Sequence, residues 1–173
     1  NNPADPEEFF FKNQYGYTHY IQNGDSSLPM GNGITESTYS FFPYYPLVFN
    51  TQNPSSNYIL IENVWKSEDG GANYIKLSNF LQSESRGGLL LVHAADSNYL
   101  YTSKMKSSDG GLTWAPLTQV LDYINKITID PNDPLRLWAV NSANAAIVSY
   151  SDDGGNSWTE LPCQDLPVQR SSD

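Results

Sequence analysis

A nine-residue segment occurs three times in this chain, and this repetition constrains the fold more than any other feature of the sequence. The copies occupy residues 66–74, 106–114 and 150–158 and align without gaps. Each contains Asp-Gly-Gly, has a serine two residues before the aspartate, and ends in Tyr or Trp. The aspartates are separated by 40 and 44 residues. A fixed period of this length predicts similar structural units arranged in tandem.

The residues that flank each copy indicate what one unit contains. Before the third copy come a strand-like run at 127–130, an Asp133-Pro134 turn and a second strand-like run at 135–140. A short segment ending in Leu161 follows the copy. Such short runs between Gly, Pro, Asn and Asp predict antiparallel strands, and four strands in 40–45 residues make one β-propeller blade. No apolar pattern of period 3.6 persists for three turns, so the best helical candidate is one turn near 117–124. The predicted fold class is all-β, built from four-stranded antiparallel sheets.

The Asp-Gly-Gly segment suits a tight turn between two strands. Glycine adopts positive φ at little cost, and an aspartate side chain can accept hydrogen bonds from turn N–H groups. Serine and threonine can brace the same turn, and the terminal aromatic ring can pack on the neighbouring strand. We therefore interpret these residues as structural rather than catalytic. They are Ser67, Asp69, Gly71, Tyr74, Ser107, Asp109, Gly111, Thr113, Trp114, Ser151, Asp153, Gly155, Ser157 and Trp158.

The second copy carries a family resemblance. Residues 107–114 match Ser-x-Asp-x-Gly-x-Thr-Trp at every fixed position, a pattern that resembles the Asp-box, or BNR repeat. The third copy has Ser157 in place of Thr, and the first has Asn73 and Tyr74 in place of Thr and Trp. The chain is thus similar to the Asp-box β-propellers of sialidases, xyloglucanase-type glycoside hydrolases, sortilin-like Vps10 domains and secreted bacterial surface proteins.

The turn at 129–134, followed by Trp138, is most similar to the Vps10 and xyloglucanase branch. The resemblance covers about residues 45–162 and is specific for the fold rather than for an activity. It implies that the boxes lie at the blade periphery, away from the central binding face. It supplies no match to the catalytic acids of xyloglucanases.

The repeat also divides the chain. We predict an N-terminal arm and degenerate blade at 1–44, three Asp-box blades at 45–162, and a tail or linker at 163–173. Four blades are the lower limit for a closed propeller, and the resembling families close with six or more. An open arc exposes strand edges that can pair with another chain. We therefore expect an incomplete propeller, either a portion of a larger secreted bacterial protein or one completed by a partner chain.

Charge and composition exclude several classes of protein. Nine basic and nineteen acidic residues give a net charge of −10, which repels nucleic acid and anionic membranes. The longest apolar run, at 89–92, is too short to span a bilayer. A single cysteine, Cys163, cannot form an intrachain disulfide. No metal-ligand or phosphate-loop pattern is present, so no cofactor and no metal are expected. The acidic, Asn-, Ser- and Tyr-rich composition favours an extracellular or outer cell-surface location.

The residues needed for catalysis are scarce. A sialidase needs an arginine cluster, and the chain has three arginines without the Arg-Ile-Pro motif. A glycoside hydrolase needs two carboxylates across a cleft. Glu62 and Asp96, at the ends of strand-like runs, are the weak candidates, and we interpret both as solvated loop carboxylates.

The sequence therefore predicts a binding or scaffolding module without catalytic activity of its own. Its ligand is expected to be a glycan or another protein. The candidate contacts are Tyr44, Tyr45, Tyr99 and Trp138, although each of them also suits core packing. Two alternatives remain: a part of a xyloglucanase-like hydrolase, and a sortilin-like protein- or peptide-binding receptor domain.

Overall fold

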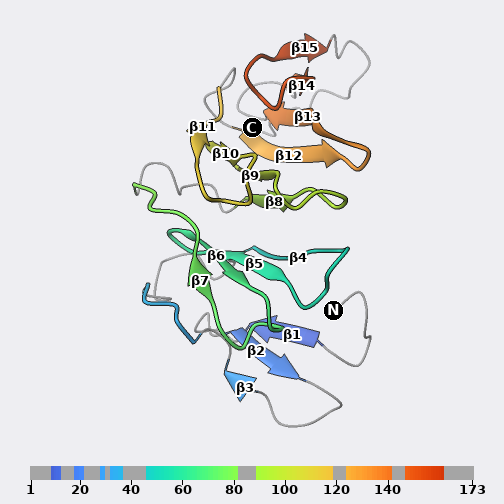
Figure 1. The fold of residues 1–173 in the computed structure, drawn as a ribbon. Coiled ribbons are helices and arrows are strands. Elements are labelled where there is room, and N and C mark those ends of the chain that lie inside the picture. The colour runs from blue at the N-terminus through green and yellow to red at the C-terminus, as the bar shows by residue number, and fades with distance from the viewer. Residues whose placement is uncertain are drawn as a thin grey trace, which may run out of the picture.

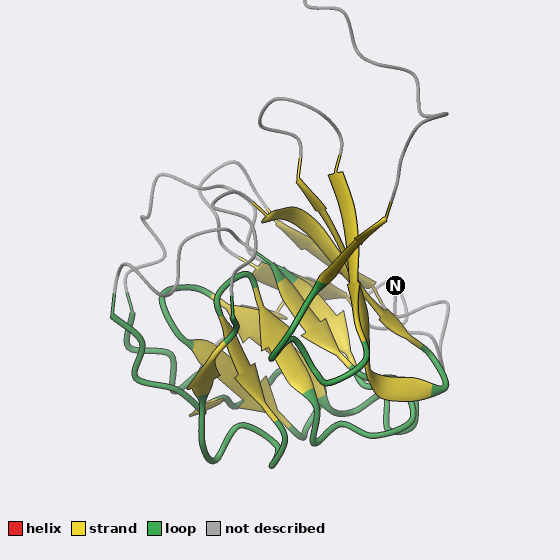
Figure 2. Ribbon diagram, turned by 90° about the horizontal axis from the view of Figure 1, so that it is seen from above, coloured by secondary structure: helices red, strands yellow, loops and turns green. Residues whose placement is uncertain are grey.

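The fold is all-β, as the repeat predicts. The computed structural model describes residues 9–12, 18–21, 28–29, 32–36, 46–81, 89–118, 124–141 and 147–161, and these ranges contain no helix. Figure 1 shows four sheets that follow one another in chain order, from blue at the N-terminal end to red at the C-terminal end. Figure 2 shows the strands joined by loops and turns. Residues 119–123, the middle of the predicted helical turn, lie outside the described residues.

Each sheet is an antiparallel meander whose strands pair in the order of the sequence. The first sheet has three strands, β1 (Phe9–Lys12), β2 (Thr18–Ile21) and β3 (Leu28–Pro29). The second contains β4 (Leu47–Phe49), β5 (Asn57–Leu60), β6 (Val64–Ser67) and β7 (Ile75–Lys76). The third contains β8 (Leu90–Val92), β9 (Leu100–Thr102), β10 (Met105–Ser107) and β11 (Ala115–Pro116). The fourth contains β12 (Ile124–Asp130), β13 (Asp133–Asn141), β14 (Ile147–Ser151) and β15 (Thr159–Leu161).

Side chains from both faces of the inner sheets form the core. All four residues of β5 are buried, because neighbouring segments cover both faces of its sheet. On one face, Ile59 packs with Trp65 and the half-buried Ile34. On the other, Tyr58 packs in one cluster with Leu100 of the third sheet. Successive strand residues point to opposite faces, so a strand between two sheets needs apolar residues at consecutive positions.

A second cluster joins the third sheet to the fourth. Tyr101 and Leu117 pack there with Ile127, Leu137 and Ala139. The exposed fraction is 0% for Leu137 and 1% for Tyr101 and Ala139. The second sheet thus packs face to face on the third, and the third on the fourth, which is the packing of propeller blades.

The turns at one end of the sheets also bond to each other. Thr51 Oγ1, in the β4–β5 turn, donates to the carbonyl of Ala94 in the β8–β9 turn (3.0 Å). The buried His93 ring accepts a hydrogen bond at Nδ1 from the Asp96 amide (3.1 Å). Its Nε2 therefore carries the proton and donates to the carbonyl of Asp130 in the fourth sheet (3.0 Å). These bonds place the turns between the first and second strands of the sheets at a common end.

The three Asp-Gly-Gly segments form the turns between the third and fourth strands of their sheets. In the second copy, Ser107 Oγ donates to Asp109 Oδ1 (2.7 Å) and accepts from the Gly111 amide (2.9 Å). The amide of Thr113 donates to Asp109 Oδ1 (2.9 Å), and its hydroxyl donates to Oδ2 (2.5 Å). The corresponding bonds recur in the third copy. In the first copy, Asn73 Nδ2 takes the place of the threonine hydroxyl (2.7 Å to Asp69 Oδ2).

The terminal aromatic residues have a longer reach than the sequence suggests. Trp114 Nε1 donates to the carbonyl of Leu77 (2.9 Å), and Trp158 Nε1 donates to that of Thr118 (2.8 Å). Both acceptors follow the last strand of the preceding sheet, so each indole joins two sheets. Tyr74 differs, because its hydroxyl donates to Asn57 Oδ1 within its own sheet.

The turn aspartates predict how stability depends on pH. The side-chain hydrogen bond from Asn73 lowers the pKa of Asp69 to about 2, and that from Thr113 lowers the pKa of Asp109 to about 2. An unfolded aspartate has a pKa of about 3.9. The stability that these bonds contribute is therefore complete above pH ~5 and is lost progressively as pH falls from ~5 to ~2. The thermal unfolding midpoint, measured from pH 7 to pH 2, should decrease between pH ~5 and pH ~2. Asp109→Asn should make the midpoint depend less on pH in that range. A midpoint that stays constant down to pH ~3 would contradict this role.

Candidate functional site

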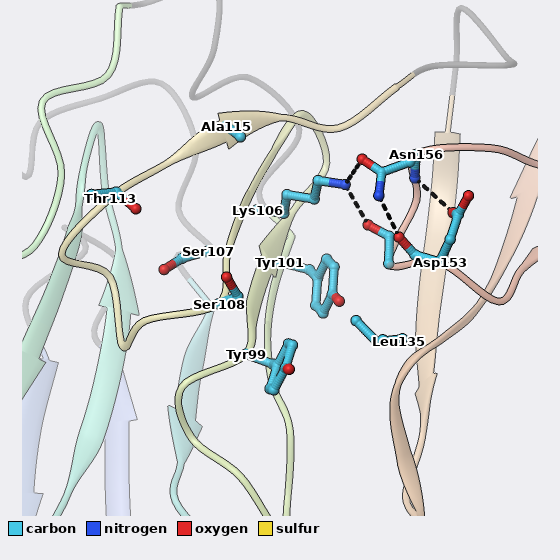
Figure 3. Close-up of a pocket in the computed structure, with 11 residues that line it drawn as sticks. Tyr99, Tyr101, Lys106, Ser107, Ser108, Thr113, Ala115, Leu135, Asp153 and Asn156 are labelled. Carbon is cyan, nitrogen blue, oxygen red and sulfur yellow. Dashed lines mark hydrogen bonds between the residues drawn. The ribbon is translucent and has the colours of Figure 1, made fainter.

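A pocket lies between the third and fourth sheets. Its volume is about 220 Å³, and Figure 3 shows the side chains that line it. The third sheet contributes two tyrosines and a lysine, and the fourth contributes a leucine and polar groups of its Asp-Gly-Gly turn. These lining residues include Tyr99, Tyr101, Lys106, Leu135, Asp153 and Asn156.

The register of the third sheet places the tyrosines and the lysine together. Tyr101 of β9 pairs with Lys106 of β10, so their side chains lie on one face of the sheet. Tyr99 is two residues before Tyr101 and shares that face. The Tyr101 hydroxyl donates to the carbonyl of Pro134 (2.8 Å), which fixes its ring against the fourth sheet. The apolar side of the pocket is therefore formed by Tyr99 and Leu135, while Tyr101 is 1% exposed and packs in the cluster between the two sheets (Figure 3).

Lys106 links the polar side of the pocket to the next sheet. Its Nζ donates to the carbonyl of Gly154 (2.8 Å) and to Asn156 Oδ1 (2.6 Å), which are two of the dashed lines in Figure 3. An ammonium group has three N–H donors, so one more remains beyond these two bonds to described residues. Burial lowers the pKa of Lys106, and the nearby Asp153 carboxylate partly offsets this effect.

The charges in the pocket are balanced. Burial raises the pKa of Tyr101 to about 12, so its phenol is neutral at physiological pH. The hydrogen bond from Ser157 lowers the pKa of Asp153, so this carboxylate is charged. Lys106 and Asp153 thus contribute one charge of each sign. Such a pocket suits a small neutral molecule that has an apolar face and several hydroxyl groups.

The structure separates the four tyrosine and tryptophan candidates. Tyr99 lines the pocket. Trp138 lies on the opposite face of the fourth sheet, because its neighbours Leu137 and Ala139 both face the third sheet. Tyr44 and Tyr45 lie outside the described residues.

Sequence reasoning missed Tyr101, Lys106 and Asn156 as pocket residues. One signal was available, because Lys66 and Lys106 occupy the same position, three residues before the aspartate of their segment. The pocket also adjoins two Asp-Gly-Gly segments. The family resemblance instead led us to expect ligand contacts away from those segments.

Glu62 and Asp96 do not meet. Glu62 lies between β5 and β6, at one end of the second sheet. Asp96 lies between β8 and β9, at the end where Thr51 contacts Ala94. The two carboxylates are therefore at opposite ends of the strands, and Asp96 Oδ1 accepts a hydrogen bond from the Asn98 amide (3.0 Å). This pair cannot flank one glycosidic bond.

Glu36 is a shielded carboxylate that the sequence did not single out. Its side chain is 8% exposed and accepts hydrogen bonds from Trp65 Nε1 (3.0 Å) and from the amides of Glu62 (3.1 Å) and Asn63 (3.0 Å). Lys76 Nζ lies 3.2 Å away. Burial alone would raise the pKa of Glu36, but the bonds from Trp65 and Asn63 outweigh burial and lower it. These bonds fasten residues 32–36 to the β5–β6 turn, which is a structural role.

The described part of the chain contains no group of three or more His, Cys, Asp or Glu side chains placed to hold a metal ion. Nor does it contain a helix with the length and hydrophobicity of a membrane span.

Comparisons with known proteins show which solved structures have a similar fold. No known family model matches the chain, and no curated protein matches it in sequence. It resembles the crystal structure of an ancestral GH74 enzyme, with a TM-score of 0.67 and 13% identity over 95% of this chain and 24% of that one. The crystal structure of the GH74 enzyme of Niastella koreensis has a TM-score of 0.65 and 17% sequence identity to this chain, over 92% of this chain and 28% of that one.

The GH74 xyloglucanase of Xanthomonas campestris gives a TM-score of 0.50 and 14% identity over 94% of this chain and 38% of that one. The chain thus spans between 24% and 38% of the length of these three structures. At such low identity the likeness concerns the fold alone. Together with the four stacked antiparallel sheets, it shows that this chain is made of β-propeller blades.

Proposed function

We propose that this chain is a binding module of an extracellular or cell-surface β-propeller and that it holds one ring of a neutral saccharide between its third and fourth sheets. The observation that carries the proposal is the pocket itself. Its apolar side, made of Tyr99 and Leu135, lies in one pocket with the hydrogen-bonding groups of Lys106 and Asn156. The apolar C–H face of a pyranose packs on aromatic rings, while its hydroxyl groups need donors and acceptors.

The size of the pocket supports a single ring. Sites for drug-sized ligands enclose about 300–1,000 Å³. The volume here, about 220 Å³, is smaller. One sugar unit of a longer chain fits this space if the rest of the saccharide runs along the surface.

The charges support a neutral ligand. The chain carries a net charge of −10, which disfavours phosphate- and carboxylate-bearing molecules. Lys106 does not reverse this preference, because it already bonds to Gly154 and Asn156 and faces Asp153. A neutral saccharide has no ionic charge to desolvate.

The alternative is that the chain is part of a glycoside hydrolase. It is favoured by the fold, since the three similar structures are GH74 enzymes and one is a xyloglucanase. The pocket offers one carboxylate, Asp153, among its lining residues. The oxygens of Asp153 already accept hydrogen bonds from Ser151 Oγ (2.8 Å) and Ser157 Oγ (2.6 Å). Canonical glycoside hydrolysis needs two carboxyl groups. Binding without hydrolysis is therefore the better account of this site, and xyloglucan is the first polysaccharide to test.

A matched pair of tyrosine substitutions tests the binding proposal. Tyr99→Ala removes the aromatic ring from the apolar side and should weaken saccharide binding about tenfold, which corresponds to ~1.4 kcal/mol. Tyr150→Ala is the control, because Tyr150 pairs with Trp138 and lies on the far face of the fourth sheet. Calorimetric titration with xyloglucan oligosaccharides, after a glycan array has ranked the ligands, gives both affinities.

Three results would count against binding at this pocket. Equal affinities of the two variants would place the ligand elsewhere, and no retention of any saccharide by the folded chain would exclude glycan binding. Release of reducing ends from the polysaccharide would favour the hydrolase alternative.

A further inference from the structure

The far face of the fourth sheet carries a row of apolar side chains. Trp138 of β13 pairs with Tyr150 of β14, and Val140 pairs with Val148. These four side chains point away from the third sheet, because the residues between them, such as Ala139 and Ser149, point toward it. Trp138, Val140, Val148 and Tyr150 are each half-buried.

The same positions in the second and third sheets are covered by the sheet that follows each of them. By strand register, Trp138–Tyr150 corresponds to Tyr58–Lys66 in the second sheet and to Tyr101–Lys106 in the third. Tyr58 and Tyr101 are each 1% exposed, and both belong to the clusters that join their sheet to the next. The half-buried Trp138 thus stands where the other two sheets place a fully covered aromatic ring.

The joint between successive sheets has a second repeated part. A Cβ on Gly111 would lie 3.0 Å from Leu77 Cδ1, and one on Gly155 would lie 2.3 Å from Leu117 Cδ1. At both of these contacts between sheets, the second glycine of the segment packs against a leucine side chain. That leucine follows the last strand of the preceding sheet, and we describe it as seated under the glycine. The indole of Trp114 donates to the carbonyl of that leucine, Leu77, and the indole of Trp158 donates to the carbonyl of Thr118, the residue after Leu117. A Cβ would overlap the leucine at Gly155 and crowd it at Gly111, and both glycines have a positive φ, 78° and 90°, that disfavours a side chain.

The fourth sheet also has a leucine at the position that contacts the glycine of the next sheet. Leu161 lies eight residues after its aspartate, as Leu77 and Leu117 lie after theirs. Leu161 is 38% exposed, whereas Leu117, which is seated under Gly155, is 3% exposed.

We infer that the far face of the fourth sheet is the docking surface for one further four-stranded sheet that carries an Asp-Gly-Gly segment. The second glycine of that sheet seats Leu161, its terminal tryptophan donates to a carbonyl at the end of β15, and its apolar face covers Trp138. The surface continues two joints that the chain already forms. A second copy docked face to face would bring neither a glycine nor an indole to Leu161. This inference is independent of saccharide binding.

A tandem chain supplies such a sheet. Repeating residues 124–161 after Asp173 leaves 12 residues, 162–173, as the connection. The second and third sheets are joined by 13 residues and the third and fourth by 7, so this connection is long enough. The measurement is the shift in denaturation midpoint that Trp138→Lys causes in the 173-residue chain and in the tandem chain. In the tandem chain the substitution is made in the original fourth sheet and not in the added copy. We expect a small shift in the 173-residue chain and a shift several times larger in the tandem chain, where the lysine would be buried.

Two variants control this test. Trp138→Phe should keep most of the tandem chain's stability, because it retains an apolar ring. A tandem chain with valine in place of the added glycine that corresponds to Gly155 should lose the extra sensitivity to Trp138→Lys, since valine cannot seat Leu161.

Three outcomes would overturn the inference. Equal shifts in the two chains would mean that the added sheet does not dock on this face. A valine variant that behaves like the unmodified tandem chain would remove the role of the glycine. A dimer of the 173-residue chain that Trp138→Lys dissociates would identify a second copy as the occupant.

Discussion

Replacing Leu100 with alanine is expected to lower the free energy of unfolding by about 2–5 kcal/mol, the cost of removing a large side chain from a packed core. Leu100 is 0% exposed and packs with Leu60 and Val64 of the second sheet. The substitution leaves a cavity between two sheets, which can close only if the sheets move together. Urea denaturation followed by circular dichroism measures the loss.

Leu112 is the matched control for this substitution. It belongs to the Asp-Gly-Gly turn of the same sheet and is 83% exposed. Leu112→Ala should therefore change the free energy of unfolding by no more than about 0.5 kcal/mol. Equal losses for the two variants would mean that the second and third sheets do not pack as described.

Replacing Gly155 with alanine is expected to cost about 2–4 kcal/mol. The residue has a φ of 78°, where an L-residue with a Cβ is disfavoured by roughly 1–2 kcal/mol. The added Cβ would also lie 2.3 Å from Leu117 Cδ1, and relieving such an overlap in a packed core costs about 1–3 kcal/mol. Both terms act at the joint between the third and fourth sheets, and urea denaturation measures their sum.

Gly70→Ala separates the two terms. Gly70 has a φ of 75°, yet a Cβ on it would meet no atom within 4 Å. It should therefore show the backbone cost alone, about 1–2 kcal/mol. If Gly155→Ala were no more costly than Gly70→Ala, the seating of Leu117 under the glycine would be wrong.

The local part of the fold could be predicted because the repeat encodes it over short distances. Asp-Gly-Gly between two strand-like runs defines a turn that its own residues stabilise. Asp109, for example, bonds to Ser107 and Thr113 within four residues on either side. A single aligned motif therefore indicated where β10 ends and where β11 begins.

The joints between sheets could not be predicted in this way. The indole of Trp114 donates to the carbonyl of Gly111 in its own turn, but its second hydrogen bond, to the preceding sheet, depends on how the sheets stack. The acceptor in the preceding sheet, Leu77, is 37 residues away. Glu36 lies outside the repeat, so the pattern gave no reason to connect it with Trp65.

The pocket was hidden for the same reason. Its polar wall depends on a contact between Lys106 and Asn156, which are 50 residues apart and belong to different repeats. Sequence reasoning selected tyrosines and tryptophans one at a time and found Tyr99 among them. It placed Trp138 in the same group, although the strand alternation around Leu137 and Ala139 puts Trp138 on the other face.

The most direct test of saccharide binding between the third and fourth sheets is an amide NMR titration of the chain with a neutral xyloglucan oligosaccharide. If the saccharide binds in this pocket, the amide signals of Tyr99, Lys106 and Asn156 shift and reach saturation, and no new reducing ends form in the sample. Shifts centred instead on Glu62 or Trp138, or hydrolysis of the oligosaccharide, would contradict binding in this pocket.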